Sequence, residues 1–134
     1  MTTREKLSAA VDLFYQAFGA NDPGMLAGVA TDDFRIEIPR LDHVPLKPTY
    51  VGVDGFRQLL KDREGRINYS AFDLHDRIIG DDAVVVFGHT DGEAVVEQRK
   101  FSHDWEHVFR FKNGRVDVFK EYVDTSEVCV AMAP

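Results

Sequence analysis

The chain has 134 residues, of which 44% are hydrophobic and 29% are charged, and this composition predicts one globular domain spanning residues 1–134. Its net charge of −7, with acidic and basic residues interspersed, argues against nucleic acids and anionic membranes as partners. Cys129 is the only cysteine, which excludes an internal disulfide and a cysteine-based metal site.

The N-terminal segment carries helix signals. Thr2 and Glu5 form a capping-box pattern, and apolar residues then recur at spacings of three and four until a stop near residues 19–21. Asp22 and Pro23 predict the start of a short second helix that runs to about residue 29. The chain shows neither a signal peptide at its start nor an apolar run long enough to span a membrane, so we expect a cytoplasmic protein.

A strand, a loop and a third helix are expected next. Apolar residues alternate with polar ones over residues 34–38, which predicts a short half-buried strand. Residues 40–52 contain two prolines and no clear periodicity, and long loops of this kind often cover a site. A helix is expected from Val53, ending at Gly65.

The rest of the chain is predicted to be β-rich. We expect strands over residues 69–79, 83–90, 101–111 and 115–123, with turns at 80–82 and 112–114. Helices followed by antiparallel strands are typical of an α+β fold.

The strand over residues 101–111 has an unusual face. Strict alternation places six ring-bearing side chains on it: Phe101, His103, Trp105, His107, Phe109 and Phe111. Aromatic rings interrupted by imidazoles favour a concave pocket that holds an apolar molecule and offers groups for proton transfer.

Two neighbouring strands add polar groups to this pocket. If Phe119 points inward, so does Glu121, and burial would shift the pKa of this carboxyl toward the working pH. Glu121 and His107 can approach each other across an antiparallel pair, as an acid/base couple or as a purely structural pair. Phe87 and His89 share a face of the strand from Ala83 that we expect to meet the pocket.

A metal site is an alternative interpretation of the histidines. His103 and His107 stand roughly 13 Å apart along a strand, too far to share one ion. A set made of His89, His107 and Glu121 stays open. The chain has no Gly-x-Ser-x-Gly nucleophile motif and no phosphate-binding loop.

The order of these features resembles the NTF2-like superfamily, in particular its SnoaL-like and ketosteroid-isomerase-like members. The resemblance rests on residues 18–22, Asp32-Asp33-Phe34, the helix over 52–60 and above all the segments 105–116 and 121–125. It implies an α+β cone in which a curved antiparallel sheet wraps the long first helix, encloses an apolar cavity and forms homodimers through its outer face. It leaves the reaction open, because the superfamily contains isomerases, cyclases, hydrolases and non-catalytic binding proteins.

The functional residues of the isomerases do not carry over. Their tyrosine falls at Phe14, beside Tyr15, their general base falls at Ile38, and their oxyanion-hole acid falls at His107. The aspartate–arginine–aspartate set of limonene-type epoxide hydrolases also lacks its arginine here. Cyclases of the SnoaL-like type, which use an Asp or His base, are the nearest match.

We therefore expect a SnoaL-like protein that binds a small apolar or aromatic carbonyl compound and works on it by acid/base chemistry without a cofactor. His107 is the expected proton shuttle, Glu121 orients it or exchanges protons with it, and His89 polarises an oxygen of the ligand. The residues expected to shape the cavity are Phe14, Tyr15, Ile36, Ile38, Phe87, Trp105, Phe109 and Phe119. The alternative is a non-catalytic ligand-binding or structural dimer.

Overall fold

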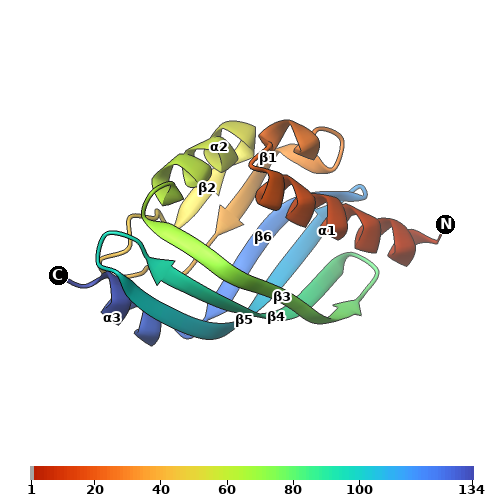
Figure 1. Ribbon diagram of the computed structural model, residues 1–134. Coiled ribbons are helices and arrows are strands. Elements are labelled where there is room, and N and C mark those ends of the chain that lie inside the picture. Colours follow the sequence, from red (N-terminus) through yellow and green to blue (C-terminus); the bar gives the residue numbers. More distant parts are fainter. Residues whose placement is uncertain (1) are drawn as a thin grey trace.

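One strongly curved sheet of six strands forms the frame of the protein (Figure 1). The computed structural model describes residues 2–134. The helices are α1 (Thr3–Ala20), the 3-10 helix η1 (Pro23–Leu26), α2 (Gly52–Arg63) and α3 (Ser126–Met132). The strands are β1 (Ala30–Glu37), β2 (Thr49–Val51), β3 (Ile67–Ile79), β4 (Ala83–Ala94), β5 (Arg99–Lys112) and β6 (Arg115–Val123).

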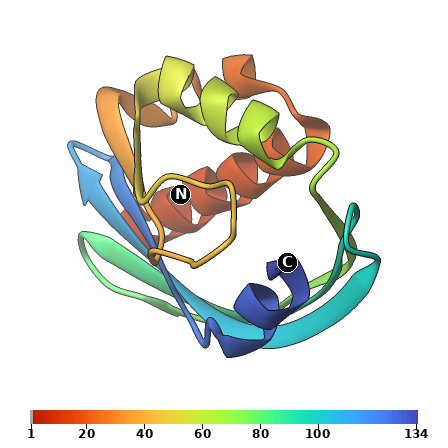
Figure 2. The same cartoon turned by 90° about the vertical axis from the view of Figure 1, so that its left-hand side faces the viewer.

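The sheet is open and mixed. Its strand order is β2-β1-β6-β5-β4-β3; β1 and β6 pair in parallel, and the other four pairs are antiparallel. The sheet curls around α1, and α2 lies across the top of the resulting cone (Figure 2). The expected α+β cone is thereby confirmed, with one parallel pair that the antiparallel expectation did not include.

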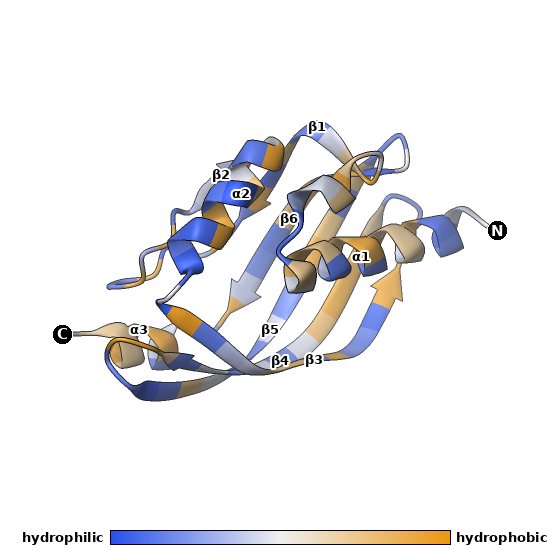
Figure 3. Ribbon diagram, turned by 45° about the horizontal axis from the view of Figure 1, so that its top comes forward, coloured by the Kyte–Doolittle hydropathy of each residue, from blue (hydrophilic) through white to orange (hydrophobic). Residues whose placement is uncertain are grey.

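Helix α1 fills the cone. The Thr2 hydroxyl accepts a hydrogen bond from the Glu5 backbone N–H at 3.1 Å, as the capping-box pattern predicts. The apolar face of the helix, which includes Leu7, Val11 and Phe14, is buried against the sheet. Apolar residues recur on α1 and on the strands across from it (Figure 3), so burial of these two faces builds the main core.

An arginine of β3 fastens the first half of α1 to the sheet. Arg77 donates to the Ser8 hydroxyl at 2.8 Å and forms an ion pair with Asp12 at 2.9 Å. These contacts hold the helix in one orientation across the strands.

Two glycines of β4 lie opposite two aromatic residues of β5. Gly88 pairs with Trp105, and Gly92 pairs with Phe101. A Cβ atom on either glycine would overlap the ring across from it. The missing side chains therefore let both rings lie flat on the inner face of the sheet, where it bends.

The open end of the cone is closed by the loop after β1 and by α3 (Figure 2). Val44 of the loop packs with Val128, Ala131 and Met132 of α3. The loop is anchored at its far end, because the Tyr50 hydroxyl accepts from the Lys47 backbone N–H and donates to Asp62. The loop expected to cover a site thus lies over one end of the interior.

Most predicted elements are found, with differences at their ends. The second helix is one short 3-10 turn, β1 starts four residues earlier than expected, and β3, β4 and β5 extend one to four residues further than expected at one or both ends. Strand β2 and helix α3 are not predicted, since each is short and lacks a clear period. The C-terminal segment around Cys129 forms α3 and packs against β5.

None of the helices within residues 2–134 combines the length and apolarity that crossing a membrane requires.

The glycine opposite Trp105 gives a stability prediction. Replacing Gly88 with Ala forces the Trp105 ring out of its place, and we expect a loss of about 1–3 kcal/mol in the free energy of unfolding by urea. Gly19→Ala in α1 is the matched control, since nothing lies within 4 Å of its added Cβ, and it should be neutral or stabilising. Equal effects of the two changes would contradict this account of the Gly88–Trp105 pair.

Candidate active site

An apolar cavity lies between α1 and the inner face of the sheet, under the loop after β1. The space in it that is open to the centre of a water-sized sphere is about 80 Å³. The polar side chains among its walls are Tyr15, Arg63, Tyr69, Thr90, His103, His107 and Glu121. The remaining wall residues are hydrophobic, so polar groups meet a cavity occupant at a few defined points.

Three of these polar residues form a chain of hydrogen bonds. The Tyr15 hydroxyl lies 2.8 Å from His107 Nδ1, and His107 Nε2 lies 2.7 Å from Glu121 Oε2. The three come from α1, β5 and β6, and His107 and Glu121 are directly opposite residues in the β5–β6 register. The predicted approach of this pair is confirmed.

Burial determines where the protons lie in this chain. His107 is 2% exposed, and its burial lowers the pKa of the imidazole, against the opposing effect of Glu121. Burial likewise raises the pKa of the Tyr15 hydroxyl, which therefore keeps its proton. We assign a neutral imidazole that donates from Nε2–H to Glu121 and accepts at Nδ1 from Tyr15.

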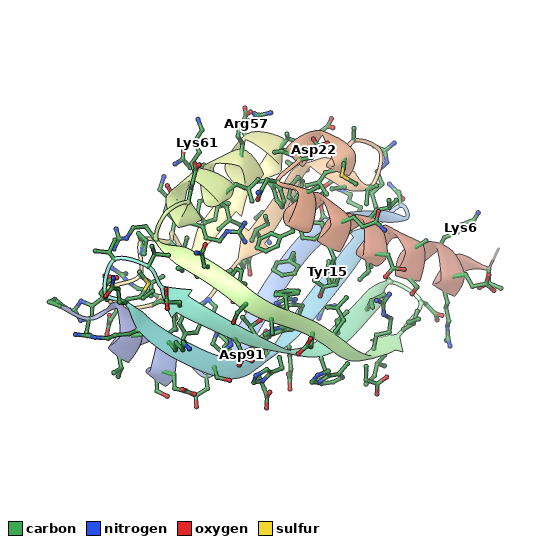
Figure 4. The ribbon with its side chains drawn as sticks, viewed as in Figure 1. Lys6, Tyr15, Asp22, Arg57, Lys61 and Asp91 are labelled. Carbon is green, nitrogen blue, oxygen red and sulfur yellow. The ribbon has the colours of Figure 1, made fainter. Side chains whose placement is uncertain are left out.

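This assignment leaves His107 with no free nitrogen. One face of its ring stacks on Trp105, with ring centroids 3.8 Å apart, and Phe119 lies at 4.6 Å. The Tyr15 oxygen and the second carboxylate oxygen of Glu121, Oε1, are therefore the atoms of this chain that remain open to further hydrogen bonds. Figure 4 shows Tyr15 extending from α1 into the space above the sheet.

The predicted wall residues fall into two groups. Phe14, Tyr15, Ile36, Ile38 and Phe119 line the cavity. Trp105 and Phe109 lie on the same inner face but behind the wall, where they support His107 and Phe14. The indole N–H of Trp105 donates to the Thr90 hydroxyl at 2.8 Å.

The predicted placement of His89 and Phe87 in the cavity is wrong. Alternate residues of β4 are buried, and the buried set contains Val86 and Thr90, so His89 and Phe87 face the outside of the sheet. The run of apolar residues in β4 left both faces equally plausible.

On the outer face, His89 lies between two carboxylates. Its ring contacts Asp104 at 2.7 Å and Asp91 at 2.9 Å, and hydrogen bonds to both raise its pKa. The metal set of His89, His107 and Glu121 is excluded, because the sheet separates His89 from the other two.

Several wall residues were not predicted. Tyr69 and Phe72 both face inward although they are three residues apart, because the β3–β4 register shifts between Tyr69 and Ala71. Arg63 projects from the end of α2, and His103 was placed on the inner face without an assigned role. A β-bulge has no clear signature in a single sequence. The position of Arg63 near the end of the predicted helix, in contrast, could have been recognised from the sequence.

Comparison with known proteins supports the fold. A crystal structure of an NTF2-like protein from Burkholderia xenovorans LB400 superposes with a TM-score of 0.85 at 24% identity, over 97% of this chain and 98% of that chain. TerC, co-crystallised with polyporic acid, superposes with a TM-score of 0.77 at 19% identity, over 95% and 98% of the two chains. A Mesorhizobium loti protein described as a SnoaL-like polyketide cyclase gives a TM-score of 0.71 at 15% identity, over 91% and 99%.

No curated protein matches the sequence. The family model of the SnoaL-like domain matches residues 11–118, which cover most of α1 and of the sheet. The chain therefore belongs to the SnoaL-like domain family, within the NTF2-like fold.

Proposed function

We propose that the protein catalyses cofactor-independent proton transfer at a carbon next to the carbonyl group of a small apolar or aromatic compound. The hydrogen-bonded chain Tyr15–His107–Glu121 at the wall of an apolar cavity carries this proposal. Membership of the SnoaL-like family, whose structural neighbours include a protein described as a cyclase, is consistent with it.

Glu121 is the general base in this scheme. Its side chain is 24% exposed, and its hydrogen bond to His107 engages only Oε2. Oε1 is therefore the atom that accepts the proton from carbon. The Nε2–H of His107 holds the carboxylate in one orientation, so His107 is a positioning residue rather than the proton shuttle first expected.

Tyr15 supplies the hydrogen bond that the developing enolate needs. Its hydroxyl has one proton, now donated to His107 Nδ1, and a carbonyl oxygen bound beside it competes for that proton. Because negative charge grows on this oxygen in the transition state, the hydrogen bond from Tyr15 strengthens as the reaction proceeds. The apolar surroundings increase that effect.

A second candidate function is ligand binding without chemistry. The observation that favours it is the saturation of His107, since both ring nitrogens already have partners, as in a structural hydrogen-bond network. Loss of activity on removing the Glu121 carboxylate separates the two candidates.

Replacement of Glu121 by Gln should abolish proton exchange at carbon. The probe is phenylacetone, a small uncharged aromatic ketone, and the measurement is deuterium uptake at its benzylic carbon in D₂O by NMR. We expect the wild type to accelerate exchange and Glu121→Gln to lose at least about 100-fold, because the base is removed. Glu106→Gln, on the outer face of β5, is the matched control and should exchange like the wild type. Equal rates in the wild type and Glu121→Gln would disprove the proposed base and favour the binding protein.

Replacement of Tyr15 by Phe should impair both catalysis and stability. Exchange into phenylacetone should fall by about tenfold or more, because the enolate oxygen loses its donor. The free energy of unfolding should drop by about 1–3 kcal/mol, because His107 Nδ1 is left buried without a partner. A variant with unchanged stability would show that this hydrogen bond is not formed in solution.

The buried imidazole also predicts a dependence of stability on pH. The unfolded chain takes up a proton on His107 near pH 6.5, while the folded protein resists that protonation. The stability contributed by the neutral imidazole is thus complete above this pH and is lost as the pH falls below it, by up to about 1.4 kcal/mol per pH unit. Urea unfolding between pH 7.5 and 5.5 should show a smaller decline for His107→Gln than for the wild type. An identical decline would assign the acid sensitivity to other groups.

A further inference from the structure

Arg63, at the C-terminal end of α2, brings a positive charge to the wall of the cavity. Its guanidinium carbon lies 4.3 Å from the centre of the Phe18 ring and 5.4 Å from that of Tyr69. Its Nη2 donates a hydrogen bond to the Asn21 side-chain oxygen at 3.1 Å. Aromatic faces and one neutral amide thus hold the guanidinium in a fixed place.

Within residues 2–134, no carboxylate forms an ion pair with Arg63, whereas Arg57 of the same helix pairs with Asp54. The chain contains 23 acidic residues, so acidic side chains are plentiful. A guanidinium has five N–H donors, and most of those on Arg63 remain available. A partly buried cation without a counterion favours binding of an anion from outside the chain.

Among the wall residues within 2–134, Arg63 is the only lysine or arginine, and Glu121 is the only carboxylate. The charges of Arg63 and Glu121 both act on the Tyr69 hydroxyl. Burial of this hydroxyl raises its pKa to about 12, helped by the negative charge of Glu121 and opposed by the positive charge of Arg63. Among the polar groups of the wall, the cavity therefore has one guanidinium and one carboxylate, and the other polar groups are tyrosine, threonine and histidine side chains.

The outer approach to Arg63 is also locally positive. A groove between the end of α1, α2 and β3 is lined by Lys61 and Arg63, by Arg57, which is paired with Asp54, and by the acidic residue Glu64. Arg57 and Lys61 project away from the sheet on this side of the molecule (Figure 4). An anion thus meets local attraction here, although the whole chain carries a charge of −7.

We propose that the occupant of the cavity is a small aromatic or apolar carbonyl compound that carries one carboxylate, and that Arg63 binds this carboxylate. Arg63 then fixes the anionic end of the molecule, and the carbon that loses a proton lies toward Glu121; this placement of the reactive end rests on the proposed function. A planar guanidinium suits a carboxylate because the two groups can form paired hydrogen bonds.

The test compares two probes of nearly equal size, 3-phenylpropanoate and its uncharged amide. Binding to the folded full chain is measured by isothermal titration calorimetry, and the fluorescence of Trp105, the only tryptophan, reports on the site. We expect the wild type to bind the carboxylate at least about tenfold more tightly than the amide. Arg63→Gln should lose at least about tenfold for the carboxylate and little for the amide.

Three controls sharpen the result. Arg110→Gln, exposed on the outer face of β5, removes the same charge elsewhere and should bind both probes like the wild type. Arg63→Lys keeps the positive charge but lacks the planar guanidinium, and it should retain part of the preference for the carboxylate over the amide. Retained amide binding shows that Arg63→Gln is folded.

The inference is overturned if the carboxylate binds no better than the amide, if neither probe binds, or if Arg63→Gln keeps the preference for the carboxylate. Failure here is distinguishable from failure of the proposed function. The exchange test uses an uncharged ketone and depends on Glu121, whereas this test measures binding and depends on Arg63.

Discussion

The burial of one imidazole is the constraint around which the interior is organised. His107 is 2% exposed, and a buried polar ring is stable only when its nitrogens have partners. Tyr15 from α1 and Glu121 from β6 supply them, so the helix and the last strand must lie at fixed positions relative to β5. The same contacts that satisfy His107 place a hydroxyl and a carboxylate at the cavity wall. The atoms that stabilise the buried imidazole are therefore the same atoms that proton transfer in the cavity would use.

The curvature of the sheet is the second requirement, because a flat sheet would leave no enclosed space beneath α1. Gly88 and Gly92 provide room for the rings of Trp105 and Phe101, and those rings support the inner surface where the sheet bends. Trp105 in turn stacks on His107 and donates to Thr90. The glycines of β4 therefore contribute to the site although they have no side chains to offer it.

Within single elements, the sequence predicted the site well where the strands are regular. Alternation along residues 101–111 placed His107 on the inner face, and alternation from Phe119 onward placed Glu121 beside it. Prediction failed where regularity breaks or where both faces look alike. The register shift next to Tyr69 brings Tyr69 and Phe72 to one face, and the apolar run of β4 concealed that Phe87 and His89 point outward. The bulge at Asp117 did not disturb the Glu121 prediction, because it precedes Phe119.

By itself, the sequence determined the order of most elements, the α+β class, the aromatic inner face of β5 and the pairing of His107 with Glu121. Each depends on local periodicity or on the neighbouring strands of a hairpin, which a linear pattern encodes directly. The tertiary structure decided that Tyr15, 92 residues away from His107, completes the chain, and that Arg63 of α2 reaches the same cavity. Periodicity shows which residues of a helix or strand share a face. It does not show which other element, far away in the sequence, packs against that face. That choice is made only when the curved sheet packs around the helices.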